Sequence, residues 1–272
     1  MERIQEAIEK ARKEREGKVG QEPVERSADI DASIEQQASG LDFGKAISVE
    51  YTKTKKIVIS DEELKAKRVI AGFAHDPRSD VYRQLRSQVL KKMRDNKWNT
   101  LAITSPSKKS GKSLTAINLA ISLSQEVNQT VMLVDLDLRN PAIHEILGFE
   151  ANKGIVDYVR KEASLDEVLI NPGFERLVIL PGTPQGPFSS EILSSPDMKQ
   201  LKQELATRYE SRIIIFDLPC LLGSDDALVF TPTVDATLLV VEDGASSREE
   251  LERSLKLLEG SELLGTVLNK QT

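Results

Sequence analysis

A series of apolar runs, separated by turns and helical patterns, occupies the chain from Asn99 to its end. The runs read LAITS, TVMLVDL, RLVILPG, RIIIFDL, ATLLVVE and GTVLN, with helical patterns at 112–126, 196–208, 224–230 and 246–258. The runs are continuously apolar rather than alternating, as expected for strands that are covered on both faces. This alternation of strands and helices predicts an α/β fold, with a mostly parallel sheet and helices on both faces.

The first part of the chain has a different composition. Residues 1–17 are highly charged with a thin apolar stripe, which predicts an N-terminal amphipathic helix. Such a helix is either solvated or a docking element for another protein, and the sequence leaves both open. Residues 18–54 have few large apolar groups and predict a flexible linker. We expect the folded domain over 55–272, with a helical lead-in at 60–97 and a core at 98–272.

The lead-in shows two helix starts. Residues 55–60 (KKIVIS) predict a short strand or extended arm, and Ser60 with Glu63 forms a capping-box pattern. Ser79 is the expected N-cap of a second helix, DVYRQLRSQVLKKMRDN. One face of that helix is expected to carry a four-residue repeat of apolar side chains, namely Val81, Leu85, Val89 and Met93.

Composition excludes several classes of protein. The net charge of −6 gives no global argument for nucleic-acid binding. Cys220 is the single cysteine, so an intrachain disulfide framework is excluded and a reducing compartment fits. No apolar run is long enough to cross a bilayer, and the charged start is not a signal peptide. We expect a cytoplasmic protein without a transmembrane segment, whose membrane contact comes through a partner or a surface helix.

The loop after the first apolar run indicates nucleotide binding. It reads TSPSKKSGKS and ends in Gly111, Lys112 and Ser113, directly before a helical pattern. In a phosphate loop such a glycine allows close approach of the backbone, the lysine reaches the β- and γ-phosphates, and the serine hydroxyl binds Mg²⁺. The first helical turn adds unpaired N–H groups under the phosphates. The full motif is not met, because Pro106 occupies its first glycine position.

Acidic residues end two further apolar runs. VMLVDLDLRNP carries Asp135 and Asp137, with Arg139 two positions on, and RIIIFDLP carries Asp217. Ligands of parallel α/β sheets bind at the carboxyl ends of strands. One carboxylate holding the waters of Mg²⁺ and another orienting a nucleophile are sufficient for phosphoryl transfer.

Other candidates are less specific. Asn269, after the last run, either meets a nucleotide base or caps a loop. His75 and His144 have no neighbours at metal-ligand spacing, so a metal site built on them is not expected. We expect Cys220 to be a small buried residue and Trp98 to be a packing anchor.

Together these motifs resemble the bacterial tyrosine autokinases of exopolysaccharide synthesis, within the larger clan of cell-division-site and plasmid-partition ATPases. The resemblance covers roughly residues 75–270. It rests on TSPSKKSGKSLTAINLA, VMLVDLDLRNPAIHEILG, IIIFDLP, SSEILSSP and the C-terminal third from DDALVF onward. Asp80, Arg83 and Arg86 resemble the family's Glu-x-x-Arg-x-x-Arg self-association motif, with Asp in place of Glu.

The resemblance implies a role for each matching residue. Lys112 would bind the phosphates, Ser113 would bind Mg²⁺, Asp135 would act as base or orient water, and Asp217 would support the metal. Asp137 and Arg139 would shape the site or a neighbouring-subunit contact, and Arg83 and Arg86 would reach a neighbour in a ring. The complete expected set is Lys112, Asp135 and Asp137 for catalysis, Ser113, Asp135 and Asp217 for metal, Arg83, Arg86 and Arg139 for the oligomer interface, and Lys108, Lys109, Ser110, Gly111, Lys112, Ser113, Leu114 and Asn269 for ATP.

The implied function is that of a Mg-ATP-dependent tyrosine kinase that regulates chain-length control and export of a polysaccharide. Its implied partner is a separate membrane chain-length (co-polymerase) protein, which would place it peripheral to the inner membrane. The family's loop usually reads Pro-Gly-Glu where this chain has Lys108, Lys109 and Ser110, and its terminal tyrosine cluster has no counterpart among Tyr51, Tyr82, Tyr158 and Tyr209. Two alternatives therefore stay open, a nucleotide-binding assembly subunit without kinase activity and a positioning ATPase.

Overall fold

The described residues of this computed structural model are 54–207 and 211–271, and all belong to one compact unit, Lys45–Thr272. The predicted helix at 1–17 and all of the predicted linker except Thr54 lie outside the described residues. The domain boundaries proposed from the sequence stay a prediction.

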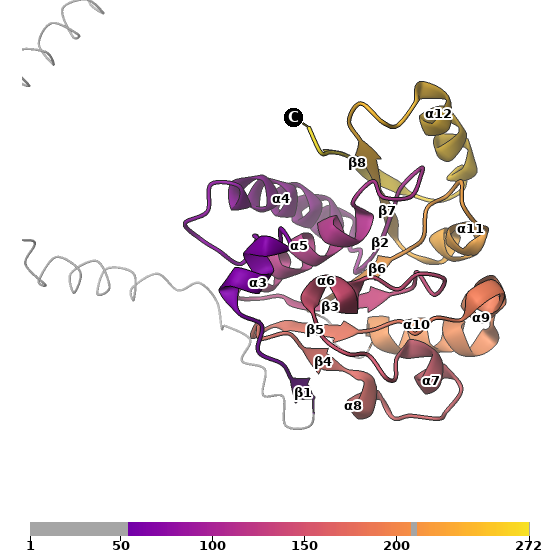
Figure 1. The fold of residues 1–272 in the computed structure, drawn as a ribbon. Coiled ribbons are helices and arrows are strands. Elements are labelled where there is room, and N and C mark those ends of the chain that lie inside the picture. Colours follow the sequence, from indigo (N-terminus) through magenta and orange to yellow (C-terminus); the bar gives the residue numbers. More distant parts are fainter. Residues whose placement is uncertain (1–53, 208–210, 272) are drawn as a thin grey trace, which may run out of the picture. The chain divides into compact units, whose positions relative to one another are not determined.

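A single eight-stranded sheet organises the described residues, with helices on both of its faces (Figure 1). Its strand order is β1-β4-β5-β3-β6-β2-β7-β8, and every neighbouring pair is parallel except β4 and β5. The strands are β1 Lys55–Lys56, β2 Thr100–Thr104, β3 Thr130–Asp135, β4 Ile170–Asn171, β5 Leu177–Leu180, β6 Arg212–Asp217, β7 Ala236–Glu242 and β8 Leu263–Asn269. The predicted α/β fold is confirmed.

The helices divide between two apolar cores, one on each face of the sheet. One core receives side chains from α3 Asp61–Ala66, α4 Ser79–Asn96, α5 Lys112–Ser124 and α6 Ile143–Leu147. The other receives them from α7 Ile155–Val159, α8 Leu165–Val168, α9 Ser189–Ser194, α10 Pro196–Thr207, α11 Asp226–Phe230 and α12 Arg248–Leu257. Two 3₁₀ turns, η1 Gly186–Phe188 and η2 Thr231–Thr233, complete the order. Because both faces are covered, the central strands β2, β3, β5 and β6 are buried at every position, which explains their continuous apolar runs.

Several local expectations differ from the structure. The strand at KKIVIS is only two residues long, and its partner β4 had no recognisable signal in the sequence. The N-cap of α4 is Arg78 rather than Ser79, because the Ser79 hydroxyl donates backwards to the carbonyl of Asp76 instead of accepting from the first turn. On the predicted apolar face of α4, Val89 and Met93 are buried but the side chain of Val81 is 66% exposed.

The lead-in is fixed to the helix that follows the phosphate loop. The capping box of Ser60 and Glu63 is present at the start of α3, as predicted. Buried Asn118 of α5 accepts hydrogen bonds from the N–H groups of Ile70 and Ala71, at 2.8 and 3.0 Å, and donates to the carbonyl of Arg68. Since a buried amide without partners is costly, these bonds hold the lead-in against α5.

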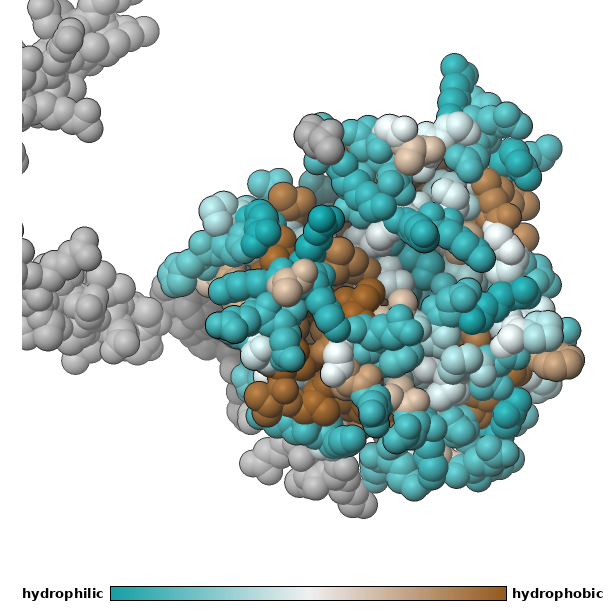
Figure 2. Space-filling model, viewed as in Figure 1, coloured by the Kyte–Doolittle hydropathy of each residue, from teal (hydrophilic) through white to brown (hydrophobic). Residues whose placement is uncertain are grey.

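The surface of the described domain is mainly polar. In Figure 2 the apolar atoms on the visible face gather over α6 and toward β1, whereas the surface over α12 is largely hydrophilic. Trp98, expected as a packing anchor, is partly buried against the core beside α4. Among the described residues, no helix is both long and apolar enough to cross a membrane.

Candidate active site

The candidate site lies at the carboxyl ends of β2, β3 and β6. Asp135 and Asp217 are register partners at the ends of adjacent strands β3 and β6, and Ile103 of β2 is the partner of Asp217 on its other side. The parallel register therefore brings the two acidic motifs and the loop after β2 to one edge of the sheet, where α/β proteins bind their ligands.

The loop between β2 and α5 has its carbonyl groups bonded and its amides free. The carbonyls of residues 105, 106, 107 and 110 accept hydrogen bonds from other parts of the protein or from serine hydroxyls within the loop. Within the described residues, none of the amide N–H groups of residues 107–111 donates a hydrogen bond. The first turn of α5 adds further free N–H groups and the positive end of its dipole. Such an array of donors suits a phosphate.

Two residues of this loop adopt the left-handed conformation. Gly111 has φ +90°, and a side chain there would collide with Asn269, whose amide nitrogen lies 2.1 Å from the position of a Cβ. Lys109 has φ +66°. A non-glycine residue in this region costs on the order of 1–3 kcal/mol unless its surroundings impose the conformation.

Asn269 holds the loop from the end of the edge strand β8. It ends β8, and its side-chain amide donates a 2.8 Å hydrogen bond to the carbonyl of Ser110. Of the two interpretations left open by the sequence, contact with the loop is the one present here. Binding of Asn269 to a nucleotide base stays a prediction.

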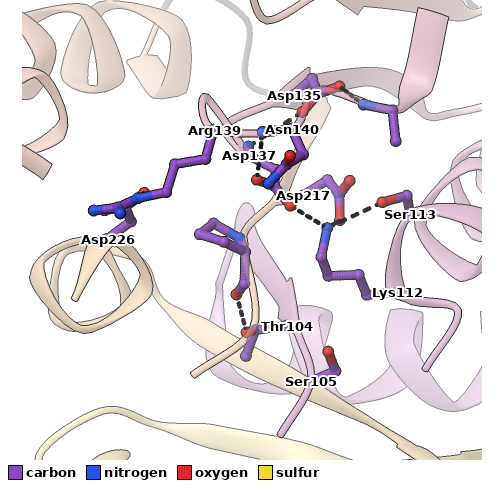
Figure 3. A network of polar contacts seen from close by, with 12 residues as sticks. Thr104, Ser105, Lys112, Ser113, Asp135, Asp137, Arg139, Asn140, Asp217 and Asp226 are labelled. Carbon is purple, nitrogen blue, oxygen red and sulfur yellow. Dashed lines mark hydrogen bonds and ion pairs between the residues drawn. The ribbon is translucent and has the colours of Figure 1, made fainter. Parts of the chain in front are cut away.

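Lys112, the first residue of α5, points into a group of carboxylates (Figure 3). Its Nζ lies 2.9 Å from Oδ2 of Asp137 and 3.5 Å from Oδ1 of Asp217, and it donates to the hydroxyl of Ser113 at 3.1 Å. Burial by itself would lower the pKa of Lys112, but the attraction of Asp217, Asp137 and Asp135 outweighs burial and raises it. Lys112 is therefore a fixed cation.

Asp135 is buried and bonded to backbone. One oxygen accepts from the N–H of Asp137, and the other accepts from the N–H groups of Ala142 and Ile143 at the start of α6, both at 3.0 Å. Burial and then the neighbouring carboxylate of Asp217 raise the pKa of Asp135 to about 8. Asp135 thus shapes the segment after β3 in addition to carrying charge.

Asp217 is equally buried, but its oxygens have no hydrogen-bond donor at bonding distance and geometry. Its nearest cation is Lys112, and burial raises its pKa. A buried carboxylate without donors beside a serine hydroxyl fits a role in holding the waters of a divalent cation, since Mg²⁺ keeps several waters and takes oxygen ligands. Ser113 and Asp217 are therefore compatible with the metal role expected for them.

Asp137 and Arg139 complete the segment after β3 in different ways. Oδ1 of Asp137 accepts from the N–H of Asn140, so its other oxygen stays directed to Lys112. Arg139 points away from Lys112 toward Asp226 of α11 (Figure 3). Its Nε donates to both carboxylate oxygens of Asp226, at 3.0 and 3.3 Å, and its Nη2 donates to one of them at 3.0 Å.

Asp226 and Ser189 are residues that sequence reasoning missed. The Asp226 side chain is completely buried, and the hydroxyl of Ser189 in α9 donates to it at 2.7 Å. Ser189 lies within the quoted SSEILSSP and Asp226 within DDALVF, but neither stretch has a motif that indicates chemistry. Only the fold brings them to the acidic segment.

A cavity of about 810 Å³ opens in front of these groups. This volume lies within the usual range of small-molecule sites. Of the expected ATP-binding residues, Lys108, Lys109, Gly111, Lys112, Ser113 and Leu114 line it, as do Asp137 and Arg139. Asp135 and Asp217 lie behind this wall, and Ser110 and Asn269 support the loop from outside. Cys220, buried as expected, is also at the wall.

The expected interface arginines lie on α4, outside this cavity, and both have partners within the chain. Arg83 pairs with Asp80 and donates to the carbonyl of Ala74. Arg86 donates to the carbonyl of Ser122 in α5 at 2.9 Å and pairs with Glu126 at 3.2 Å. Their part in a ring, like that of Arg139, stays a prediction.

His75 and His144 do not form a metal centre with their neighbours. Throughout residues 54–207 and 211–271, there is no group of three or more His, Cys, Asp or Glu side chains arranged to hold a metal ion. His144 lines the cavity near α6 and packs edge-on against Phe149.

Relatives and solved structures agree with this geometry. The chain is 31% identical over 193 residues to the tyrosine-protein kinase YwqD of Bacillus subtilis, covering 70% of this chain and 80% of that protein. It is 28% identical to the putative tyrosine-protein kinase CapB of Staphylococcus aureus, covering 73% and 88%. No family model matches.

Among solved structures, the kinase domain of the Escherichia coli tyrosine kinase Etk has 26% identity and a TM-score of 0.69, covering 82% of this chain and 89% of that one. The chimerical protein CapA2B2 has 24% identity and a TM-score of 0.70, covering 88% and 98%. The septum site-determining protein MinD of Pyrococcus horikoshii shares the fold, with 23% identity, a TM-score of 0.52 and coverage of 62% and 69%. The chain belongs to the bacterial tyrosine-protein kinases.

Proposed function

We propose that this protein binds a nucleoside triphosphate with Mg²⁺ and transfers the terminal phosphoryl group to a tyrosine hydroxyl. The observation that supports this most directly is the loop of residues 107–111, whose amides are free while its neighbouring carbonyls are bonded. Lys112, the expected phosphate ligand, lies at its end within reach of two carboxylates. The relatives' names supply the reaction, and MinD, which shares the fold, was solved with Mg-ADP.

The residues of the site have separable parts in this reaction. The loop amides and Lys112 hold the phosphates, and the Ser113 hydroxyl and Asp217 hold the cation and its waters. When bound, the cation supplies positive charge that stabilises the transferring phosphoryl group. Because Lys112 is now neutralised by Asp137 and Asp217, phosphate binding must compete with these carboxylates for its ammonium.

Asp137 is the carboxylate placed to meet the acceptor hydroxyl. It lines the cavity, whereas Asp135 is fully buried and bonded to three amides. We assign proton acceptance to Asp137 and assign Asp135 to holding the Asp137 backbone in place. Lys112 would pass from Asp137 to the phosphates, which frees the Asp137 carboxylate for the tyrosine proton.

In the cell, we place this kinase beside a membrane protein that controls polysaccharide chain length. The support is the similarity to CapB, to the putative tyrosine-protein kinase EpsB of Ralstonia and to the chimerical protein CapA2B2. Location at the inner membrane through this partner and assembly into a homo-oligomeric ring are parts of the same proposal.

The deciding experiment is phosphotransfer from ATP labelled at its terminal phosphate to a tyrosine of the protein or of its membrane partner. Lys112→Ala should reduce transfer by about a hundredfold or more, because it removes a preorganised charge from the reacting phosphates. Lys199→Ala, on the exposed side of α10, is the matched control and should leave transfer unchanged.

Label no higher than in Lys112→Ala would contradict the kinase proposal. Tight nucleotide binding without turnover would then favour the assembly subunit, and turnover without phosphotyrosine would favour the positioning ATPase. Intact mass before and after phosphatase treatment distinguishes these outcomes.

A further inference from the structure

Two lysine side chains line the cavity but have no role in the proposed reaction. Lys108 and Lys109 are exposed loop residues that line it alongside Lys112. Among the described residues, neither Lys108 nor Lys109 forms an ion pair, whereas Lys112 is paired with Asp137 and lies near Asp217. Their ammonium groups are therefore available to a ligand.

Lys108 reaches across the mouth of the cavity. Its Cε lies 3.8 Å from the position that a Cβ on Gly223 would occupy, in the segment after β6. Burial raises the pKa of the Cys220 thiol on the same wall, and the charges of Lys112 and Lys108 oppose that rise. The Lys108 side chain is exposed, and it reaches from the loop toward the opposite wall of the site.

Lys109 occupies a strained position where a glycine would be free of strain. Its φ of +66° is unfavourable for a residue with a Cβ, and no hydrogen bond of its side chain stabilises the conformation within the described residues. Backbone strain of this kind is found preferentially at functional sites. The strained turn places a second cation on the cavity wall.

Among the charged side chains that line the cavity itself, those without an ion-pair partner are mainly positive. Asp137 is paired with Lys112, and Arg139 is paired with Asp226. The remaining charged groups that line the cavity are Lys108, Lys109 and Glu145, with His144 beside them. Such an excess favours the ligand with more negative charge, and a triphosphate carries more than a diphosphate.

We propose that Lys108 and Lys109 make this site select nucleoside triphosphate over diphosphate, by supplying positive charge to the outer phosphates from within the same chain. This inference rests on the proposed nucleotide site and concerns which nucleotide that site prefers. After transfer, loss of the terminal phosphate removes the groups that these lysines contact, so the diphosphate leaves more readily.

The test compares affinities for ATP, ADP and AMP, each with Mg²⁺, by isothermal titration calorimetry at low and high salt. Lys108→Ala and Lys109→Ala should each weaken ATP binding by about two- to fivefold, as for an exposed charge pair, and the double variant by about tenfold. ADP should be affected less and AMP not at all. The salt dependence of ATP binding should become shallower in the double variant.

Further variants separate charge from backbone strain at position 109. Lys109→Arg keeps the charge and should retain ATP selectivity. Lys109→Gly removes both charge and strain, and should lose selectivity just as Lys109→Ala does. Lys199→Ala, outside the cavity, should change none of the affinities.

Equal losses for all three nucleotides in the two alanine variants would overturn the inference, as would unchanged ATP affinity in the double variant. Failure of the wild-type protein to bind ATP at all is a different result, since it contradicts the proposed nucleotide site itself.

Discussion

The two walls of the site use their backbone in opposite ways. In the loop after β2, the carbonyls of residues 105, 106, 107 and 110 are bonded, and the amides of residues 107–111 are free within the described residues. In the segment after β3 the amides of Asp137, Asn140, Ala142 and Ile143 are all bonded to the carboxylates of Asp135 and Asp137. One wall therefore offers donors to an anion, and the other uses its donors to hold anions in place.

This difference indicates which part of the site is stable without a ligand and which part a bound ligand should stabilise. The acidic segment is satisfied without any ligand, so it should be rigid and should contribute to stability. The loop has unsatisfied amides, a strained lysine and an ammonium held by carboxylates, so phosphate binding should stabilise it. Variants in the two walls should accordingly affect different measurements.

The largest stability effect is expected at Asp135. Asp135→Ala leaves the N–H groups of Ala142 and Ile143 without an acceptor, and should lower the free energy of unfolding by about 2–4 kcal/mol. Asp135→Asn keeps an acceptor for these amides and should cost much less, while phosphotransfer falls in both variants. Urea unfolding measures the difference, and equal losses in the two variants would show that Asp135 does not organise the segment.

A substitution at Asp226 tests whether its hydrogen bonds with Arg139 stabilise the segment after β3. Asp226→Asn weakens the hydrogen bonds from Arg139 and should lower the free energy of unfolding by about 1–2 kcal/mol. The matched control is Asp225→Asn. Asp225 is exposed and its contact with Arg139 is longer, at 3.5 Å, so the variant should have almost no effect on stability. If the two variants lower the free energy of unfolding equally, Asp226 does not support the acidic segment in this way.

The pH dependence of the free energy of unfolding tests the repulsion between the carboxylates of Asp135 and Asp217. For Asp135 the folded-state pKa, about 8, is above its ordinary value of 3.8, so the folded protein binds this proton more tightly than the unfolded chain does. Its contribution to stability is therefore present at low pH and is lost as the pH rises from about 4 to about 8.

Asp217→Asn should reduce that loss, because the Asp217 carboxylate raises the pKa of Asp135. Relative to wild type, the variant should gain on the order of 1 kcal/mol between pH 5 and pH 8, measured by urea unfolding without Mg²⁺ or nucleotide. Asp95→Asn, on the exposed face of α4, is the control. Parallel pH profiles of wild type and Asp217→Asn would contradict the proposed repulsion.

The smallest effect is expected in the loop. Lys109→Gly relieves the left-handed conformation and should raise the free energy of unfolding by about 0.5–1 kcal/mol, after allowing for the extra freedom of glycine in the unfolded chain. Lys109→Ala keeps the strain and should show no such gain. If both variants behave alike in thermal unfolding, the loop conformation is not a source of strain.

Much of the fold followed from local patterns. The apolar runs at β2, β3, β5, β6, β7 and β8 and the helices α5, α10, α11 and α12 lie close to the expected ranges. Buried strands of ordinary length leave continuous apolar runs, and helices leave a separate pattern between them. The strands β1 and β4 have only two residues each, which is too short for such a run. The antiparallel pairing of β4 with β5 therefore emerged only from the structure.

The site divides in the same way. Gly111, Lys112, Ser113 and the aspartates at strand ends were identified because their chemistry follows from residue type and position in a motif. Asp226 and Ser189 were missed because they meet Arg139 only through the packing of α9 and α11. The family resemblance implied that Asp135 acts as the base and that Asp137 shapes the site, although only Asp137 lines the cavity.

The sequence by itself determined the α/β architecture and the residues at the carboxyl edge of the sheet, since both depend on local periodicity and motif chemistry. The tertiary structure decided which role each of those side chains has. Whether a carboxylate faces the cavity, holds a backbone amide or stays without a donor depends on contacts between segments far apart in the chain. Lys112 meets Asp217, and Ser110 meets Asn269, only after the parallel strands have aligned their ends.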